Sequence, residues 1–235
     1  MSRIEGPPQA RVRMKFAKSG RVRFLSHLDT MKSMERALRR AGLPVSYSEG
    51  FHPHMRFSFG PALALGHGSV AEWLDLDIGQ PLDAEEVKAA LNRALPPGLE
   101  ILEARTVPLQ TPTLGATLRR AVYRVRLAAE AFEGVPERLQ ALLAQQEIPL
   151  QKKNTRKNTN TNTKIVNVRS FVEDVRIVED FLLLLTLRLG PEGSIRPEDV
   201  LAHLTEPDGS GVVAIERIAL QQPRGDEWVD PWPDA

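Results

Sequence analysis

Residues 24–59 read FLSHLDTMKSMERALRRAGLPVSYSEGFHPHMRFSF, and this stretch decides how the first half of the chain folds. Ser26, followed three positions later by Asp29, has the spacing of a capping box, in which two side chains satisfy free backbone N–H groups at the start of a helix. Apolar residues then recur at helical spacing up to Ala41, and Gly42 is a typical C-terminal stop. The pattern predicts a helix from about residue 27 to residue 41.

Strand-like segments surround this helix. Polar and apolar residues alternate in most of them, as they do in half-buried strands. We predict strands at residues 11–17, 43–48, 55–59, 70–78 and 99–104, and a second helix at residues 84–95. The order β-α-β-β-α-β is that of a ferredoxin-like unit, with residues 55–59 either a core strand or an extra ribbon beside it.

The rest of the chain repeats this order of elements without repeating its sequence. We predict strands at 121–127, 181–189 and 212–220, and helices at 135–145 and from Pro197, with residues 148–152 and 164–168 as a possible strand pair and residues 175–178 leading into the strand at 181. The expected fold is therefore α+β, with two ferredoxin-like halves side by side and a cleft between them. The expected boundaries are 10–107 for the first half, 108–120 for a connector, 121–222 for the second half with a basic polar insert at 153–163, and 223–235 for a loose acidic tail.

Composition limits the chemistry that the chain can perform. The 235 residues include no cysteine, which excludes disulfides, thiolate metal sites, cysteine nucleophiles and iron–sulfur ligation by this chain. Neither an export signal nor a membrane-spanning segment is recognisable, so we expect a cytoplasmic protein. The net charge of +1 conceals basic blocks, +8 in residues 1–60 and +6 in residues 151–170. Such blocks favour a polyanionic partner, although charge segregation also occurs on ordinary solvated surfaces.

Three of the five histidines lie in the quoted stretch. His27 falls in the first helical turn, where the helix dipole disfavours a positive charge, so a neutral imidazole there can accept a proton near pH 7. Asp29 either caps the helix or orients that imidazole. His52 and His54 follow Gly50 in a Pro-containing loop and could share a metal with His27, but no fourth ligand is evident. We therefore expect no metal and no cofactor, and a loop that contacts a phosphate or a base or is only structural.

Cations and aromatic residues alternate through the same region. Arg36, Arg39 and Arg40 fall on one helical face, and arginine forks suit phosphate oxygens. Aromatic residues interspersed with cations are typical of single-strand nucleic-acid binding, although some of these aromatics are expected to pack in the core. The candidate site for RNA phosphate comprises Ser26, Arg36, Arg40, Ser48, His54 and Arg56, with His27 and His52 as catalytic candidates if the protein is an enzyme.

Three motifs resemble the bacterial radical SAM-linked protein family, a domain of unknown function. They are the run from Arg23 to Asp29, the run from Glu35 to His54, and the segment from Ser194 to Val200. The resemblance covers roughly residues 11–220. Members of that family occur fused to, or encoded beside, a radical S-adenosylmethionine enzyme, often near ribosomal-protein and ribonuclease genes. The resemblance thus implies a radical SAM enzyme as partner and a setting in RNA metabolism, whereas this cysteine-free chain cannot itself hold the cluster.

Three functions fit these observations. The leading hypothesis is an accessory protein that binds or positions RNA, either tRNA or rRNA, for a radical SAM modification enzyme. An alternative is a metal-independent endoribonuclease in which His27 or His52 removes the proton of a 2′-hydroxyl. The third is a protein-interaction module without RNA affinity, whose acidic C-terminal half docks on a basic partner.

Overall fold

The computed structural model describes residues 7–153, 163–206 and 209–233. The chain divides into two compact units, one of residues 1–119 with 216–235 and the other of residues 120–215. Each unit combines a few helices with hydrogen-bonded strands, which confirms the α+β fold class. The boundary differs from the prediction, because residues from Glu216 onwards belong to the first unit and not to the second.

The first unit contains a mixed sheet with two longer helices. Its strands are β1 (Ala10–Lys18), β2 (Phe57–Phe59), β3 (Gly68–Ile78), β4 (Leu99–Val107), β12 (Glu227–Val229) and the later part of β11 (Val212–Arg224). Its helices are η1 (Gly20–Phe24), α1 (His27–Ala41), α2 (Ala84–Ala94) and the short α3 (Leu114–Thr117). The order β4-β1-β3-β2 is antiparallel throughout, and β11 pairs in parallel with the beginning of β3.

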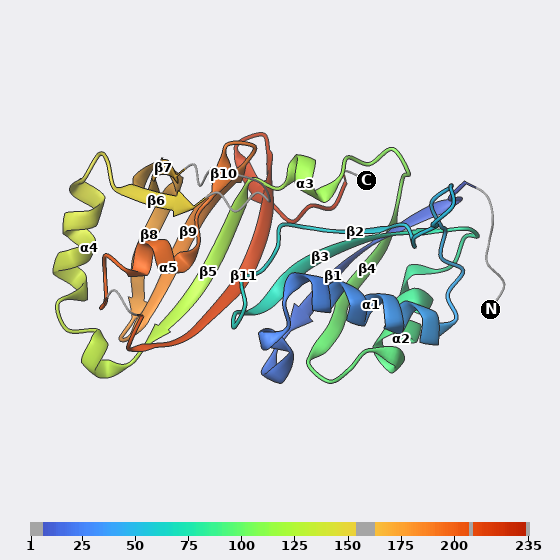
Figure 1. Cartoon of the computed structure of the whole chain (residues 1–235), viewed down its shortest axis with the longest axis horizontal. Coiled ribbons are helices and arrows are strands. Elements are labelled where there is room, and N and C mark those ends of the chain that lie inside the picture. The colour runs from blue at the N-terminus through green and yellow to red at the C-terminus, as the bar shows by residue number, and fades with distance from the viewer. Residues whose placement is uncertain (1–6, 154–162, 207–208, 234–235) are drawn as a thin grey trace. The chain divides into compact units, whose positions relative to one another are not determined.

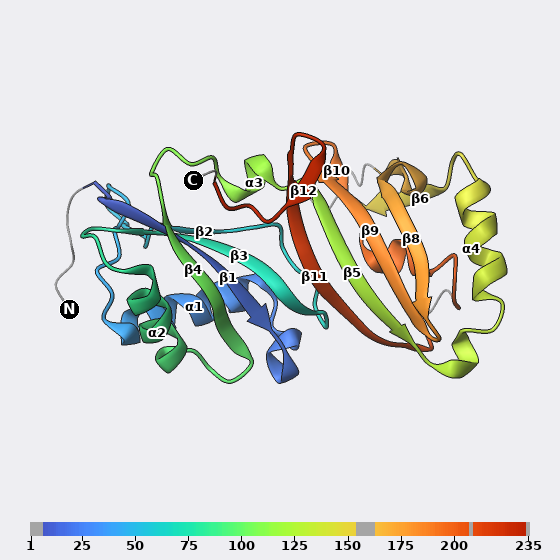
Figure 2. The same ribbon diagram turned by 180° about the vertical axis from the view of Figure 1, so that it is seen from behind.

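Both α1 and α2 cover one face of this sheet (Figures 1 and 2). Helix α1 begins and ends where the sequence predicts: Ser26 accepts a hydrogen bond from the backbone N–H of Asp29, and Gly42 ends the helix in the left-handed conformation at φ 70°. Met34 and Leu38 of α1 pack with the apolar residues of the strands into one buried core. Residues 43–48 differ from the prediction of a strand, since they make isolated bridges at residues 45–47, and β2 is the edge strand instead.

The opposite face of β3 is covered by the C-terminal segment. Trp232 is almost fully buried and packs edge-to-face on Trp73, with 4.7 Å between ring centroids. Arg13 is 1% exposed, pairs with Asp75 at 2.7 Å and donates a hydrogen bond to the carbonyl of Pro231. The expectation of a loose tail at 223–235 was therefore wrong up to Pro233, because aromatic burial and buried hydrogen bonds hold this segment against the sheet.

The second unit is built around an antiparallel group of strands. Its elements are β5 (Arg120–Leu127), η2 (Ala129–Ala131), α4 (Val135–Ala144), β6 (Pro149–Lys153), β7 (Thr163–Asn167), η3 (Val168–Phe171), β8 (Val172–Glu179), β9 (Leu182–Gly190), β10 (Gly193–Ser194) and α5 (Pro197–Leu201). Strand β9 pairs with β5 and β8, and β5 also lies beside β11, whose residues up to Ile215 belong to this unit. β6 and β7 form a separate hairpin, and most of the predicted basic insert, residues 154–162, lies outside the described residues.

Candidate functional site

The first unit contains a small pocket at the beginning of α1. Its cavity measures about 10 Å³, which is room for about one water molecule. Its lining combines apolar walls with side chains that ionise or form hydrogen bonds: Phe16, Lys18, His27, Thr30, Phe59, Leu63 and Glu72. These residues come from β1, α1, β2, β3 and the loop between β2 and β3. The pocket therefore depends on the tertiary fold of this unit and not on one local motif.

Strand alternation explains why two charged residues point into this pocket. Successive side chains of a strand face opposite sides of the sheet. Lys18 lies two positions after Phe16, on the face that packs against the helices, and Glu72 lies two positions before the buried Leu74. Both are nearly inaccessible to water, Lys18 at 2% and Glu72 at 7% exposure. Charged groups thus occupy positions where the sequence pattern calls for apolar ones.

A buried ion pair joins one lining residue, Glu72, to Arg217, which lies outside the lining. Arg217 of β11 is 1% exposed and grips Glu72 with two N–H groups, of which Nε lies 2.8 Å from Oε1. It also donates to the carbonyl of Pro61 at 2.8 Å. Lys18 donates from Nζ to the carbonyl of Leu25 at 2.7 Å, which ties β1 to the residues before α1. Burial lowers the pKa of the Lys18 ammonium, and the Glu72 carboxylate opposes this change.

His27 is the first residue of α1 and lies edge-to-face on Phe59, with 5.6 Å between ring centroids. Burial lowers the pKa of its imidazole below the usual 6.5. The charge of Glu72 raises this pKa, whereas the charges of Lys18 and Arg217 lower it. A neutral imidazole at pH 7, with one donor and one acceptor nitrogen, is the consequence. Of the eight predicted site residues, all of them described, His27 is the one that lines this pocket.

The other predicted residues of α1 lie outside the pocket. Ser26 caps the helix: its Oγ accepts from the N–H of Asp29 at 3.1 Å and donates to the Asp29 carboxylate at 2.7 Å. Asp29 therefore engages the cap, one of its two predicted roles. Arg36 and Arg40 are exposed, and Arg40 donates to the carbonyl of Ala94 at 2.6 Å.

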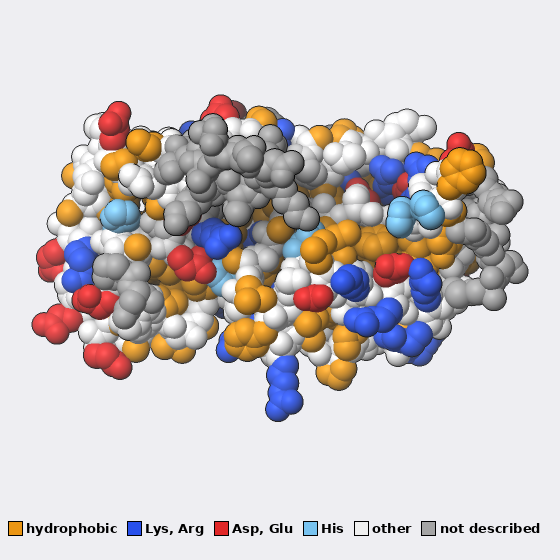
Figure 3. Space-filling model, viewed as in Figure 1, with side chains coloured by type: hydrophobic (Ala, Val, Ile, Leu, Met, Phe, Trp, Pro, Cys, Tyr) orange, Lys and Arg blue, Asp and Glu red, His pale blue; other side chains and the backbone are white. Residues whose placement is uncertain are grey.

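The outer surface of α1 is cationic. Lys and Arg side chains gather over α1 and α2 in the space-filling view (Figure 3). Arg39 pairs with Glu35 at 2.6 Å. Within the described part of the chain, no carboxylate pairs with Lys32, Arg36 or Arg40, all of which are exposed. We call Lys32, Arg36 and Arg40 the α1 cations. They leave uncompensated positive charge on this face.

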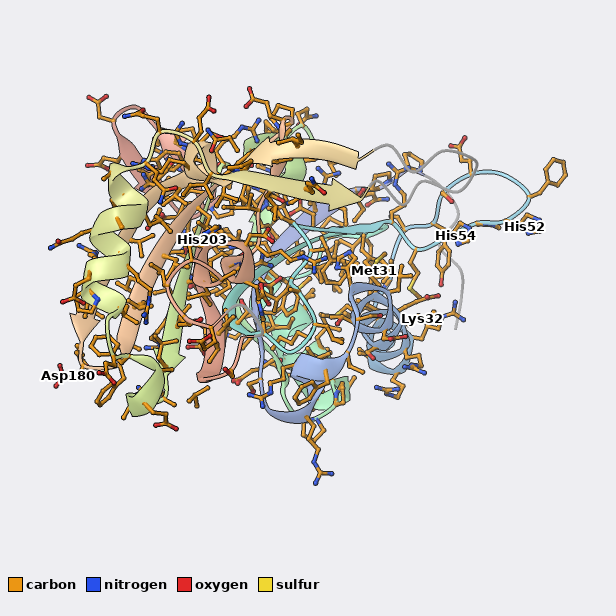
Figure 4. The ribbon with its side chains drawn as sticks, turned by 60° about the vertical axis from the view of Figure 1, so that its left-hand side comes forward. Met31, Lys32, His52, His54, Asp180 and His203 are labelled. Atoms are coloured by element: carbon orange, nitrogen blue, oxygen red, sulfur yellow. The ribbon has the colours of Figure 1, made fainter. Side chains whose placement is uncertain are left out.

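Residues 48–54, which we call the histidine loop, project away from α1. Figure 4 shows His52 and His54 at one end of the unit, beyond the part of α1 that carries Met31 and Lys32. The base of the loop is closed by hydrogen bonds from the backbone N–H of Ser48 to the carbonyl of His54 at 2.8 Å, and from the N–H of His54 to Oγ of Ser48 at 3.0 Å. His52, His54 and the neighbouring Phe51 are exposed. Ser48 thus closes the loop base.

Arg56 is the last of the predicted site residues. It pairs with Asp77 at 3.4 Å, and the same carboxylate also holds Arg11 at 2.7 Å. The structure therefore distributes the predicted residues over four places: the pocket with His27, the N-terminus and outer face of α1 with Ser26, Arg36 and Arg40, the loop with Ser48, His52 and His54, and the ion pair of Arg56 with Asp77. Among the described residues, the pocket that His27 lines includes no residue of the histidine loop.

Sequence reasoning missed Lys18, Glu72 and Arg217. A signal for them exists, because each is in phase with apolar strand positions: Lys18 with Phe16, Glu72 with Leu74, and Arg217 with Ile215. Charged residues in inward phase are rarely found fully buried unless they are paired. In-phase charges on three strands indicate that each charge is buried and paired, whereas strand pairing decides which of them meet.

Two further findings concern the described residues as a whole. No group of three or more His, Asp or Glu side chains among them is arranged to hold a metal ion. Within the same residues, no helix combines the length and the apolarity that crossing a bilayer requires.

Comparison with known proteins identifies the family. Residues 11–197 match the family described as "Uncharacterized protein conserved in bacteria (DUF2344)". The chain belongs to this family. Membership in DUF2344 confirms a bacterial domain of unknown function, and the association with radical SAM enzymes stays a prediction. No curated protein matches the chain.

Among solved structures, the chain is similar to one described as a crystal structure of a Cbf5-Nop10-Gar1 complex, with 11% identity and a TM-score of 0.42. That match covers 89% of this chain and 49% of the other, so the chain spans about half the length of the protein it matches. The similarity is too low to support a statement about fold or function.

Proposed function

We propose that this DUF2344 protein is a cytoplasmic, RNA-associated accessory protein that binds RNA through the outer face of α1 and positions it for a partner radical SAM enzyme. The observation that carries the proposal is the set of α1 cations, which are exposed and lack a carboxylate partner among the described residues. When RNA phosphates bind such a face, counterions are released and the affinity increases. Surface cations that are already paired with carboxylates would add little to the affinity. The partner enzyme rests on the family resemblance of the three sequence motifs.

The strand orders support the finer fold assignment. In the first unit, the order β4-β1-β3-β2 with α1 and α2 on one face is that of a ferredoxin-like fold. In the second, β11-β5-β9-β8 has the same order if β6 and β7 are taken as an insertion. We therefore propose two ferredoxin-like halves. The covered outer face of β3 leaves the helical side of the first unit as the RNA-binding side, unlike domains that bind RNA on an open sheet.

The test replaces the α1 cations with glutamine and measures binding of a fluorescently labelled single-stranded RNA at several salt concentrations. Each phosphate contact adds about 0.7 to the magnitude of the negative slope of log K against log salt for a single strand. The triple variant should therefore reduce the magnitude of that slope by about 2. A control of equal net charge carries Arg126→Gln, Arg176→Gln and Arg188→Gln, which remove three exposed cations from the second unit; of these, Arg176 and Arg188 pair with Asp174 and Glu173. Equal slopes for both variants would exclude the α1 face.

A second candidate function is supported by His27. Its imidazole lies in a pocket beside a buried ammonium, and burial lowers its pKa, so the ring is unprotonated and can accept a proton near pH 7. The endoribonuclease hypothesis predicts that the wild type cleaves RNA in EDTA, that His27→Ala abolishes this cleavage and that His52→Ala does not. All three proteins are incubated with the same RNA in parallel. RNA that stays intact in every incubation would rule out the endoribonuclease hypothesis.

The absence of RNA affinity at low salt, together with a stable complex with a radical SAM enzyme, would favour the third hypothesis, a protein-interaction module.

A further inference from the structure

Three large apolar side chains near the beginning of α1 are mostly exposed to water. Phe24 is 59% exposed, Leu28 is 66% exposed and Leu65 is 63% exposed. They belong to η1, to α1 and to the loop between β2 and β3. Single exposed apolar residues are ordinary on a protein surface, whereas a group of them indicates a binding surface. We call Phe24, Leu28 and Leu65 the apolar group.

Two of the three segments that carry this group contact each other directly. The backbone N–H of Gly66 donates to the carbonyl of Arg23 at 2.9 Å. A Cβ atom at Gly66 would lie 3.9 Å from Cε1 of Phe24, so the Phe24 ring lies close to the backbone that follows Leu65. The guanidinium of Arg23 lies 4.7 Å from the centroid of the same ring. Aromatic rings and arginine guanidinium planes are the side-chain groups on which unpaired bases stack.

The third member of the group, Leu28, begins a row of side chains along α1. Residues four positions apart in a helix are neighbours on its surface. Four exposed side chains of α1 have this spacing: Leu28, Lys32, Arg36 and Arg40. Each step of four residues advances about 6 Å along the helix axis. The row therefore connects the apolar group to the α1 cations, and the two form one continuous surface of the first unit.

The two carboxylates of α1 are both engaged in local contacts. Asp29 accepts a hydrogen bond from Oγ of Ser26 at 2.7 Å, and Glu35 pairs with Arg39 at 2.6 Å. A ligand that lies along the row thus meets uncompensated positive charge at one end and exposed apolar side chains at the other. An anionic backbone that carries flat apolar groups matches both parts of this surface.

This combination distinguishes between the two forms of RNA. Both a single strand and a duplex present phosphates to the α1 cations. A duplex keeps the faces of its bases inside the stack, whereas the bases of a single strand can turn outward and stack on protein side chains. Only a single strand can therefore use the apolar group and the cations together. The stacked pair of Arg23 and Phe24 favours planar bases over the side chains of an acidic peptide.

We propose that this surface selects single-stranded RNA over double-stranded RNA, because the α1 cations hold phosphates while the apolar group stacks on an unpaired base. The inference rests on the proposed RNA function and names the class of RNA that the same site binds. It assigns base contacts to Phe24, Leu28 and Leu65, three residues that the phosphate contacts do not use. Stacking is tolerant of base identity, so we expect no strong sequence preference.

The first experiment uses the wild-type full chain and three labelled probes: a single-stranded RNA, the same strand annealed to its complement, and the same strand made abasic. The intact single strand should bind about tenfold more tightly than the abasic strand, or better, which is the size of one well-stacked base. At high salt, where phosphate contacts contribute least, it should also bind more tightly than the duplex. The intact and abasic strands should show the same salt slope, because stacking releases no counterions.

The second experiment removes the apolar group without changing any charge. Phe24→Ala combined with Leu28→Ala should weaken binding of the intact single strand about tenfold and leave binding of the abasic strand and the salt slope unchanged. The matched control combines Phe51→Ala with Leu143→Ala, which also removes one exposed phenylalanine and one exposed leucine. This control should bind every probe as the wild type does.

The outcomes separate this inference from the proposed function. Equal binding of intact and abasic RNA by the wild type would overturn the inference, and so would equal losses in the two double variants. The proposed RNA function would survive either result if the salt slope still depends on the α1 cations. RNA that fails to bind in any form would overturn both. If Phe24→Ala with Leu28→Ala weakens a complex with a radical SAM enzyme but not RNA binding, the apolar group is a protein interface and the inference is wrong.

Discussion

At the scale of single residues, His27 shows what a sequence pattern can and cannot provide. Its place in the first turn of a helix was predictable, because the cap at Ser26 is local. Its surroundings were not, because Lys18, Glu72 and Arg217 reach it from three strands. The predicted neutral imidazole agrees with the lowered pKa, but burial is its largest cause and the helix terminus is not.

The titration of His27 provides a test. Its NMR midpoint should lie below 6.5, and Lys18→Met should raise it, because the Lys18 charge disfavours a second positive charge nearby. The folded-state pKa lies below the unfolded one, so the unfolded chain binds more protons between the two values. The free energy of unfolding should therefore be highest above pH 6.5 and fall as the pH decreases below it. His27→Gln should lose this part of the pH dependence, and an unchanged profile would contradict the assignment.

At the scale of elements, α1 is the part of the fold that local sequence specifies most completely. Both ends are set by neighbouring residues, Ser26 at the start and Gly42 at the end, and its inner face is set by periodicity. The segment of residues 43–48 lacks such local control: it forms isolated bridges because β2 takes the place beside β3. Edge strands of this kind are decided by pairing, which sequence periodicity does not reveal.

Ser26→Ala should destabilise the protein by about 1 kcal/mol, because the N–H of Asp29 loses its side-chain acceptor and the Asp29 carboxylate loses a donor. Urea unfolding measures this change, and Ser26→Thr, which retains both the capping oxygen and the hydroxyl donor, is the matched control. If Ser26 instead contacts RNA directly, Ser26→Ala would weaken RNA binding without changing the free energy of unfolding.

At the scale of the whole molecule, the C-terminal segment completes the first unit. An acidic, proline-rich composition suggested a loose tail, yet Trp232 packs on Trp73 and Asp230 pairs with Lys15 at 2.8 Å. The two tryptophans are separated by more than 150 positions, so no local pattern links them. Because this segment covers the sheet, the first unit is built from two parts of the chain that are far apart in sequence, residues 1–119 and 216–235.

Trp232→Ala should therefore lower the free energy of unfolding by about 3 kcal/mol, through loss of a buried aromatic side chain and the cavity left behind. Thermal or urea unfolding of the full chain measures the change. Phe51→Ala is the control: Phe51 is fully exposed at the loop tip, so its removal should change stability by less than about 0.5 kcal/mol. Equal effects of the two substitutions would show that the tail is not part of the folded unit.

The sequence by itself determined what neighbouring residues control: the bounds of α1, the α+β order of elements, and the absence of thiolate chemistry in a chain without cysteine. Only the tertiary structure decided where the charges meet. Glu72 and Arg217 lie 145 positions apart and become partners because β11 pairs with β3, and Lys18 joins them through the pairing of β1 with β3. Long-range strand pairing depends on the packing of the whole unit, and it is this pairing that brings the three charged residues together.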